Sequence, residues 1–152
     1  MMQTMIVSDF KPILTKCFAE DFELIEKWHL RAGFGLEICV DQTFNDMKEA
    51  GVECHVVYEE RELIGYFGKE KAHGQMFLTG FFVMPEYRTK EDLIEFWALI
   101  KKELGPMFYC GLYAKNQPAI DFITRNNAEP KATFNHEGEG VVVYKVEVQP
   151  CQ

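Results

Sequence analysis

The sequence predicts a single α/β domain over residues 1–152, with antiparallel strands first and one parallel strand–helix–strand crossover in the middle. Three observations predict this class. Residues 52–58 alternate apolar and polar side chains, as a half-buried strand does. Residues 76–84 and 107–114 are almost continuously apolar, which suits central strands covered on both faces. Between them, residues 90–105 place apolar side chains at helical spacing, so the unit implies parallel pairing and a right-handed crossover.

The first part of the chain predicts one strand and two helices. "MIVSDFKPIL", residues 5–14, is interpreted as a first strand with Pro12 near its end. "AEDFELIEKWHL", residues 19–30, has helical periodicity, with one apolar face that includes Trp28. "RAGFGLE" then interrupts the pattern, and "TFNDMKEAG", residues 43–51, predicts a short second helix.

The remaining elements follow in order. Residues 52–60 and 63–70 predict a hairpin around "ERE", and "KAHGQ" turns the chain into the first apolar strand. After the crossover, residues 117–126 predict a helix with a proline in its first turn, where proline is tolerated. Residues 132–148 predict a closing hairpin with a glycine-bearing turn.

Composition excludes several classes of function. The formal net charge is -8, which argues against a partner such as nucleic acid and weakly against an anionic membrane surface. No segment is long enough to span a bilayer, and "MMQTMIVSDF" lacks the pattern of a signal peptide. The five cysteines form no C-x-x-C pair and the four histidines are scattered. We therefore expect a cytoplasmic protein with free thiols and no metal site.

Two motifs carry a family resemblance. "FFVMPEYR" is an apolar strand that ends in V-x-P-x-x-R directly before a helix, and "NQPAIDFITRNNA" contains an N-x-x-A-I helix after the next strand. Together with the order of elements, they resemble the GNAT superfamily of acyl-CoA N-acyltransferases. The element order matches over nearly the whole chain, and the more specific likeness covers residues 76–128.

The resemblance implies a GNAT-like mixed sheet with splayed central strands and acetyl-CoA as co-substrate. In that family, pantetheine enters the cleft between the splayed strands and pairs with the first strand's backbone, which here implies Phe82 and Val83. The pyrophosphate is held at the turn and helix start, which implies Arg88, Thr89 and Lys90. A helix N-terminus offers free N–H donors and a partial positive charge to such an anion.

The second motif adds one more cofactor residue. Asn116 matches the asparagine that lies near the cofactor's arm in the family. The sequence departs from the family at the phosphate corner, where Glu91 and Leu93 occupy positions that are normally glycine. Glycine lets backbone approach phosphate closely, whereas these side chains crowd it. "TKED" also predicts a capping box between Thr89 and Asp92, which would satisfy the helix start without a ligand.

The catalytic end also departs from the family pattern. Ile123 stands where many members have a tyrosine that acts as general acid, and it cannot donate a proton. Tyr113 and His73 are the nearest candidates, and we select Tyr113. Cys110 has no His–Asp partner by spacing, so packing is favoured over a nucleophilic role. Asn127 replaces the closing glycine and tolerates the left-handed backbone expected there.

Two functions remain open. The chain is expected to be an acetyl-CoA-dependent N-acetyltransferase that acts on an unknown amine. The acids Glu37, Asp41 and Asp46 would attract that amine, or form a solvated face. Alternatively, the small size, the phosphate loop without glycine and the "IDF" helix resemble short GNAT-like proteins of tailed phages. In that interpretation it is a catalytically degenerate virion or accessory protein that binds a protein partner.

Overall fold

The computed structural model describes residues 1–28 and 32–147. The predictions for the side chain of Trp28 and for Cys151 lie outside the part of the chain that is described. Seven strands form one sheet in the order β1-β2-β3-β4-β5-β7-β6. The strands are β1 (Gln3–Ile6), β2 (Glu53–Glu59), β3 (Glu62–Ala72), β4 (Gln75–Val83), β5 (Met107–Tyr113), β6 (Ala128–His136) and β7 (Glu139–Glu147).

The pairing of the strands confirms the predicted fold class. β4 and β5 pair in parallel, and every other pair in the sheet is antiparallel. The helix between β4 and β5 is the predicted crossover. The described helices are α1 (Lys11–Glu20), α2 (Phe22–Trp28), α3 (Leu36–Glu49), α4 (Lys90–Leu104) and α5 (Gln117–Arg125), with short 3-10 turns at Ala32–Phe34 and Pro85–Tyr87.

The first strand is shorter than predicted. β1 ends at Ile6, and α1 begins at Lys11 with Pro12 in its first turn. Proline at the start of a helix costs nothing because its missing N–H would be unpaired there anyway, so Pro12 begins a helix rather than ending a strand. Leu14, Cys17 and Phe18 then supply the buried face of that helix at helical spacing.

The two predicted N-terminal helices also differ from the observed ones. The first, predicted over residues 19–30, is observed as α2 from Phe22, and Asp21, with φ -143° and ψ 52°, separates it from α1. α3 begins at Leu36, before the predicted start, because Gly35 turns the chain with φ 92° directly ahead of it. Gly33 lies in a 3-10 turn and Gly35 directly precedes α3.

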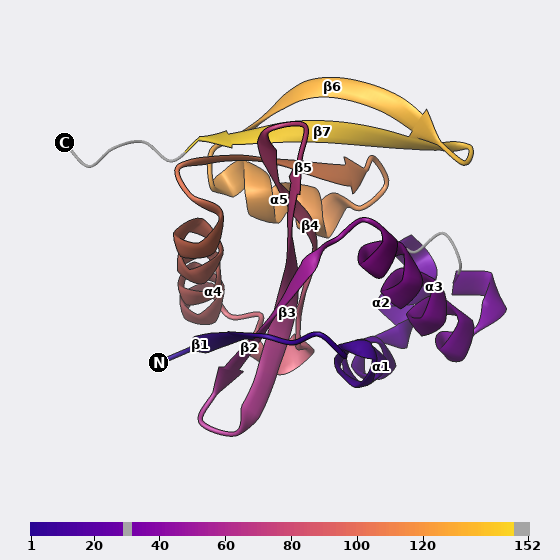
Figure 1. The fold of residues 1–152 in the computed structure, drawn as a ribbon, viewed down its shortest axis with the longest axis vertical. Helices are drawn as coiled ribbons and strands as arrows, with labels where there is room; N and C mark the ends of the chain where they lie inside the picture. Colours follow the sequence, from indigo (N-terminus) through magenta and orange to yellow (C-terminus); the bar gives the residue numbers. More distant parts are fainter. Residues whose placement is uncertain (29–31, 148–152) are drawn as a thin grey trace.

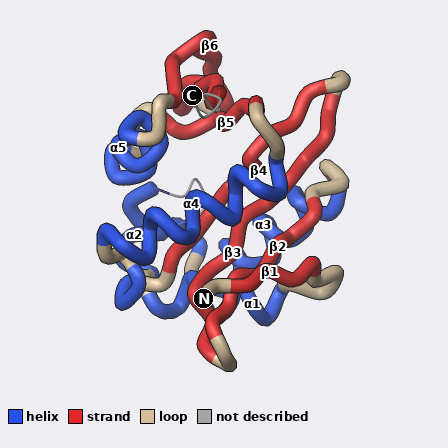
Figure 2. The backbone as a smooth tube through the Cα atoms, turned by 90° about the vertical axis from the view of Figure 1, so that its left-hand side faces the viewer, coloured by secondary structure: helices blue, strands red, loops and turns tan. Residues whose placement is uncertain are grey.

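Helices cover both faces of the sheet. In Figure 1, β2, β3 and β4 run up the centre of the view while β5, β7 and β6 cross the top, with α1–α3 on one side and α4 on the other. Figure 2 shows α4 crossing the near side of these strands, with α1 and α3 behind them. The core beneath α1–α3 consists of Phe10, Leu14, Cys17, Phe18, Ile25, Cys39, Val40, Met47, Val52, Cys54, Val56, Tyr66, Phe82 and Met84.

The second core lies beneath α4 and α5. It contains Phe96, Trp97 and Ile100 of α4 and Ile123 of α5, packed on side chains from the opposite face of the sheet. Asn127, between α5 and β6, has φ 69°, which confirms the left-handed conformation predicted there. None of the helices in the described residues is long and apolar enough to cross a lipid bilayer.

Candidate functional site

The central strands β4 and β5 part soon after they meet. Only Phe77 with Tyr109 and Leu78 with Cys110 are in register as parallel partners. Beyond them β5 continues to pair with β7 as far as Tyr113, but not with β4. The edge of β4 that faces β5 is therefore open from Thr79 onward, which confirms the predicted splay.

A bulge in β4 marks the point where the strands part. The register of β4 against β3 shifts at Thr79 and Gly80, which lie opposite Gly68. Gly80 has φ 78°, a conformation that favours glycine. A Cβ on Gly68 would lie 2.3 Å from the carbonyl oxygen of Thr79, and one on Gly65 would lie 1.9 Å from that of Phe82. Glycine at these two positions of β3 is thus required by the close approach of β4.

The backbone of Val83 faces the open edge. The N–H of Met84 donates to the carbonyl of Ile64 at 2.8 Å, so Met84 faces β3. Successive backbone groups of a strand point to opposite sides, so the carbonyl of Val83 points away from β3. The carbonyl of Phe82 points toward β3 instead, since it is the group that a side chain on Gly65 would strike. The ring of Phe82 packs beneath α1, 6.4 Å from that of Phe18.

The corner after β4 is closed by its own side chains. Thr89 is the N-cap of α4, and its hydroxyl oxygen accepts from the N–H of Asp92 at 3.2 Å. The same hydroxyl donates to the Asp92 carboxylate at 3.0 Å. These contacts confirm Thr89 as the predicted N-cap, although the Asp92 carboxylate accepts from the Thr89 hydroxyl and not from the backbone N–H that a capping box uses. Lys90 and Glu91 form the first turn of the helix, and both side chains are exposed.

Arg88 lies at the same corner and turns back toward the strand. Its Nε donates to the carbonyl of Val83 at 2.8 Å, and its Nη1 donates to the carboxylate of Asp21 at 2.6 Å. The guanidinium carbon lies 5.2 Å from the centre of the Phe82 ring. Arg88 therefore joins the open edge of β4 to the junction between α1 and α2.

The start of α5 resembles the start of α4 in being capped by its own side chain. Asn116 is the N-cap, and its Oδ1 accepts from the N–H of Ala119 at 3.4 Å. Ile123 of α5 is fully buried, so the position that matches the family's tyrosine belongs to the core.

The candidate catalytic residues lie in three different environments. Tyr113 is half-buried at the end of β5, and by strand alternation it points to the same face as Tyr109. Cys110 is fully buried, and burial raises the pKa of its thiol to about 12. A thiol of that kind stays protonated at neutral pH and packs rather than reacts. His73 lies exposed in the turn between β3 and β4 and does not line the pocket described next.

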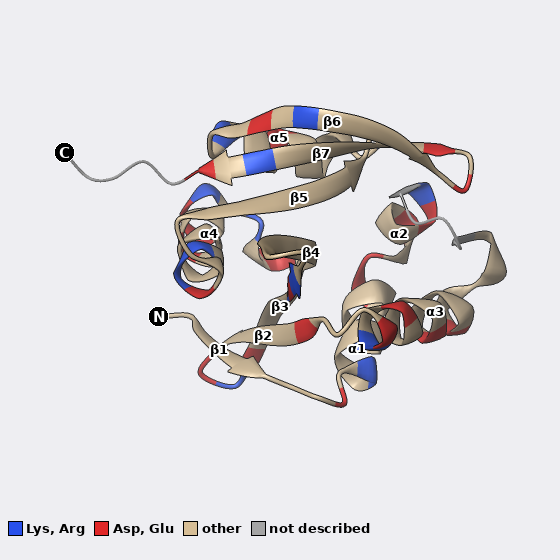
Figure 3. Ribbon diagram, turned by 45° about the horizontal axis from the view of Figure 1, so that its top comes forward, with Lys and Arg blue, Asp and Glu red and all other residues tan. Residues whose placement is uncertain are grey.

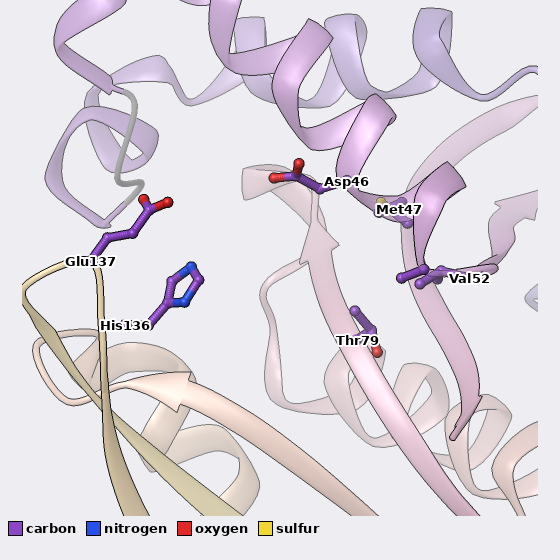
Figure 4. Close-up of a pocket in the computed structure, with 7 residues that line it drawn as sticks. Asp46, Met47, Val52, Thr79, His136 and Glu137 are labelled. Carbon is purple, nitrogen blue, oxygen red and sulfur yellow. The ribbon is translucent and has the colours of Figure 1, made fainter. Parts of the chain in front are cut away.

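A pocket opens beside the bulge (Figure 4). Its volume is about 380 Å³. Asp46 and Met47 come from the C-terminal part of α3, Thr79 from the bulge, His136 from the end of β6, and Glu137 from the turn between β6 and β7. The lining is completed by Ala50 and Val52.

Acidic side chains lie on both sides of this pocket. Figure 3 shows Asp and Glu along α3 and at the turn between β6 and β7. Of the three acids considered from the sequence, Asp46 lines the pocket, Asp41 pairs with Lys11 at 3.1 Å, and Glu37 lies in the first turn of α3. No group of His, Cys, Asp and Glu within residues 1–28 and 32–147 has a metal-binding arrangement.

Sequence reasoning missed three polar residues of this region. His136 and Glu137 belong to the predicted closing hairpin, the first at the end of a strand and the second in the turn, and nothing in the local pattern indicated that this end of the hairpin meets α3. Glu70 of β3 accepts a hydrogen bond from the hydroxyl of Thr79 at 3.0 Å, which places a carboxylate beside the bulge. The pairing of β3 with β4 was predicted, so the register of that hairpin would have been the signal for Glu70.

Several solved structures that are similar to this chain are acetyltransferases. A GNAT-family acetyltransferase from Bacillus cereus is 13% identical, with a TM-score of 0.59 and 99% of each chain covered. An aminoglycoside N(6')-acetyltransferase from Legionella pneumophila is 12% identical, with a TM-score of 0.71 over 96% of this chain and 91% of its own. A microcin C7 self-immunity acetyltransferase in complex with acetyl-CoA and AMP is 9% identical, with a TM-score of 0.68 over 97% and 92%.

Sequence similarity is absent at the level of families. No protein-family model matches the chain, and no curated protein sequence matches it. At identities of 9% to 13%, the likeness to the solved structures is one of fold alone. The chain has the fold of the GNAT acetyltransferases.

Proposed function

We propose that the chain, acting as one domain over residues 1–152, is an N-acetyltransferase that transfers an acetyl group from acetyl-CoA directly to an amine. One observation carries this proposal: β4 and β5 pair at two positions and then part, which leaves a strand edge available to a ligand. An extended ligand with amide groups can pair with such an edge as an added strand would. The acetyl-CoA in the microcin C7 acetyltransferase complex supports this choice of co-substrate.

Pantetheine is the part of the cofactor that would lie along the open edge. The carbonyl of Val83 faces the gap, and the N–H of Phe81, two residues earlier, faces the same way. Phe82 would contribute its ring rather than its carbonyl, which points toward β3. With pantetheine amides on Val83, the thioester would lie near the bulge, and the Phe81 N–H would donate to its oxygen. A fixed backbone donor at that oxygen stabilises the charge that develops when the amine attacks.

The pocket beside the bulge is the proposed acceptor site. Its volume of about 380 Å³ lies in the range of small-molecule sites. The amine nitrogen would attack the acyl carbon, and the carbon–sulfur bond would break. The thiolate would take a proton from Tyr113 or from water, and the ammonium formed on the product would lose one to water or to His136. Most of the rate enhancement would come from positioning.

The pyrophosphate is assigned to the corner between β4 and α4. Lys90 is the exposed cation in the first turn of the helix, and Thr89 and Arg88 precede it. The N–H groups of Lys90 and Glu91 have no partner within the helix, so they remain donors for a phosphate, whereas the N–H of Asp92 is taken by Thr89. Asn116 lies at the start of α5, where the cofactor's arm would pass.

Calorimetric titration with acetyl-CoA tests the proposal. We expect saturable binding, and a variant with Glu91→Gly and Leu93→Gly should bind more tightly because a negative charge and two side chains leave the phosphate corner. The variant Ala98→Gly, on the exposed surface of the same helix, controls for the loss of helix propensity. No saturable binding up to millimolar acetyl-CoA, in either the wild type or the double variant, contradicts the proposal.

A second candidate is a protein of the same fold that no longer catalyses and acts by binding a protein partner, as a phage virion or accessory protein would. The observation that favours it is the corner itself, because Thr89 and Asp92 satisfy each other and Arg88 is held by Val83 and Asp21. The same titration separates the two functions, since a protein of this kind gives no saturable signal with acetyl-CoA.

A further inference from the structure

We propose that Asp21 and Arg88 form a latch on the cofactor edge of β4, which acetyl-CoA must release in order to bind. The latch consists of the Asp21 carboxylate, the Arg88 guanidinium and the carbonyl of Val83. Asp21 is then a residue that sets the affinity for the cofactor, although it is remote in sequence from the phosphate corner. This inference rests on the proposed function, because it concerns the same edge.

Arg88 is held by three neighbouring groups. A single guanidinium donates to Val83 at 2.8 Å and to Asp21 at 2.6 Å, and its carbon lies 5.2 Å from the centre of the Phe82 ring. The Arg88 side chain is 33% exposed and that of Asp21 is 22% exposed. A planar guanidinium that is held from three directions is fixed in orientation.

Arg88 contacts Val83 at the place where the cofactor would bind. The Val83 carbonyl faces the gap between β4 and β5, where a ligand amide would pair. A donor already 2.8 Å from that oxygen competes with the ligand for it. The same guanidinium would be attracted to pyrophosphate, but its charge is matched by Asp21 in the free protein. Cofactor binding therefore requires Arg88 to exchange Asp21 and Val83 for a phosphate.

Asp21 is held in place by the helices on either side of it. Asp21 ends α1, and its carbonyl accepts from the N–H of Ile25 in α2 at 3.1 Å. Both sides of the residue are thus held by helices that pack on the sheet. The carboxylate is presented to Arg88 by the junction between the two helices, so the pair does not depend on a flexible loop.

The test compares Asp21→Asn with a matched control. Asparagine keeps the shape of the side chain but removes the charge, so we expect acetyl-CoA to bind roughly three- to tenfold more tightly, the range that loss of a partly exposed ion pair allows. Glu20→Gln removes a neighbouring exposed charge of α1 and controls for a general electrostatic gain; its affinity should change less than twofold. Calorimetry gives both values.

A second measurement follows Arg88 directly. In the wild type, the Nε–H of Arg88 should give a proton–nitrogen NMR signal protected from exchange, and addition of acetyl-CoA should shift that signal and speed its exchange. Asp21→Asn should have the same effect without ligand. The inference is overturned if acetyl-CoA binds while the Arg88 signal stays unchanged, or if Asp21→Asn binds no more tightly than Glu20→Gln. Absence of binding in all three proteins overturns the proposed function as well, which distinguishes the two failures.

Discussion

The two ends of the open edge of β4 differ in how its polar groups are used. At the bulge, the strand lies beside a pocket whose polar side chains come from α3 and from the turn between β6 and β7. At the corner, Arg88 occupies the Val83 carbonyl and Thr89 closes the helix start. The close packing of β4 on β3 depends on glycines of β3, whereas the far end of the open edge is closed by ordinary side chains. The first is a property of the fold and the second a property of this sequence.

The largest effect is expected from a variant that disrupts the close packing of β4 on β3. Gly65→Ala places a Cβ 1.9 Å from the Phe82 carbonyl, and the backbone cannot yield without separating β3 from β4. We expect a loss of about 3 kcal/mol or more in the free energy of unfolding, measured by urea denaturation. Gly33→Ala meets no atom within 4 Å and should change that free energy little. Equal losses in the two variants would show that the close approach at Gly65 is not what matters.

Filling the pocket tests the bulge end alone. Ala50→Phe adds a ring to the lining of the pocket and should lower kcat/KM for an amine by about tenfold, equivalent to about 1.4 kcal/mol of transition-state stabilisation. The affinity for acetyl-CoA, measured by calorimetry, should not change. Ala98→Phe adds the same ring to the exposed face of α4 and is the control. A fall in acetyl-CoA affinity with Ala50→Phe would place the cofactor in this pocket.

The corner end is tested by its cap. Thr89→Ala removes the acceptor for the Asp92 N–H and should lower the free energy of unfolding by about 1 kcal/mol. Thr89→Ser retains the hydroxyl and should restore most of that loss. Thermal unfolding followed by circular dichroism measures both variants. If serine and alanine behave alike, the hydroxyl is not what stabilises this helix start.

The smallest expected effect concerns Cys110, which lies where β4 and β5 part. Cys110 is the last residue of β5 that pairs with β4, and burial raises the pKa of its thiol to about 12. A group whose folded pKa is raised stays protonated well above neutral pH, so we expect no alkylation by iodoacetamide at pH 8 in the native protein. Mass spectrometry of peptides from native and urea-unfolded samples provides the comparison. Rapid modification of Cys110 in the native protein would mean that β4 and β5 also come apart at the Leu78–Cys110 pair.

The sequence predicted the fold well because its strongest signals are periodic. The alternation in β2 and the apolar runs of β4 and β5 are long enough to identify strands, and α4 has a clear apolar face. Pro12 was misassigned because proline both ends strands and begins helices, and only the packing of α1 distinguishes the two. The glycine-rich segment before α3 was ambiguous for a similar reason.

The candidate site was less predictable because it depends on side-chain orientation and on long-range contacts. Arg88 was expected to bind phosphate, but a sequence does not show that a guanidinium turns back toward its own strand. His136 and Glu137 could not be placed near Asp46 because the turn and α3 belong to separate parts of the fold. The Thr89 cap, in contrast, was predicted correctly, since a cap is decided by residues three positions apart.

The two cores of the protein differ in the order in which a ribosome would complete them. Every buried residue of the core beneath α1–α3 lies within residues 10–84, whereas the core beneath α4 and α5 draws on residues from Met2 to Val146. The first four strands pair antiparallel without any later segment. We therefore expect the N-terminal half to collapse while synthesis continues, with the edge of β4 exposed until β5 arrives. In this nascent state, the edge of β4 that we propose for acetyl-CoA would be the part most prone to wrong strand pairing.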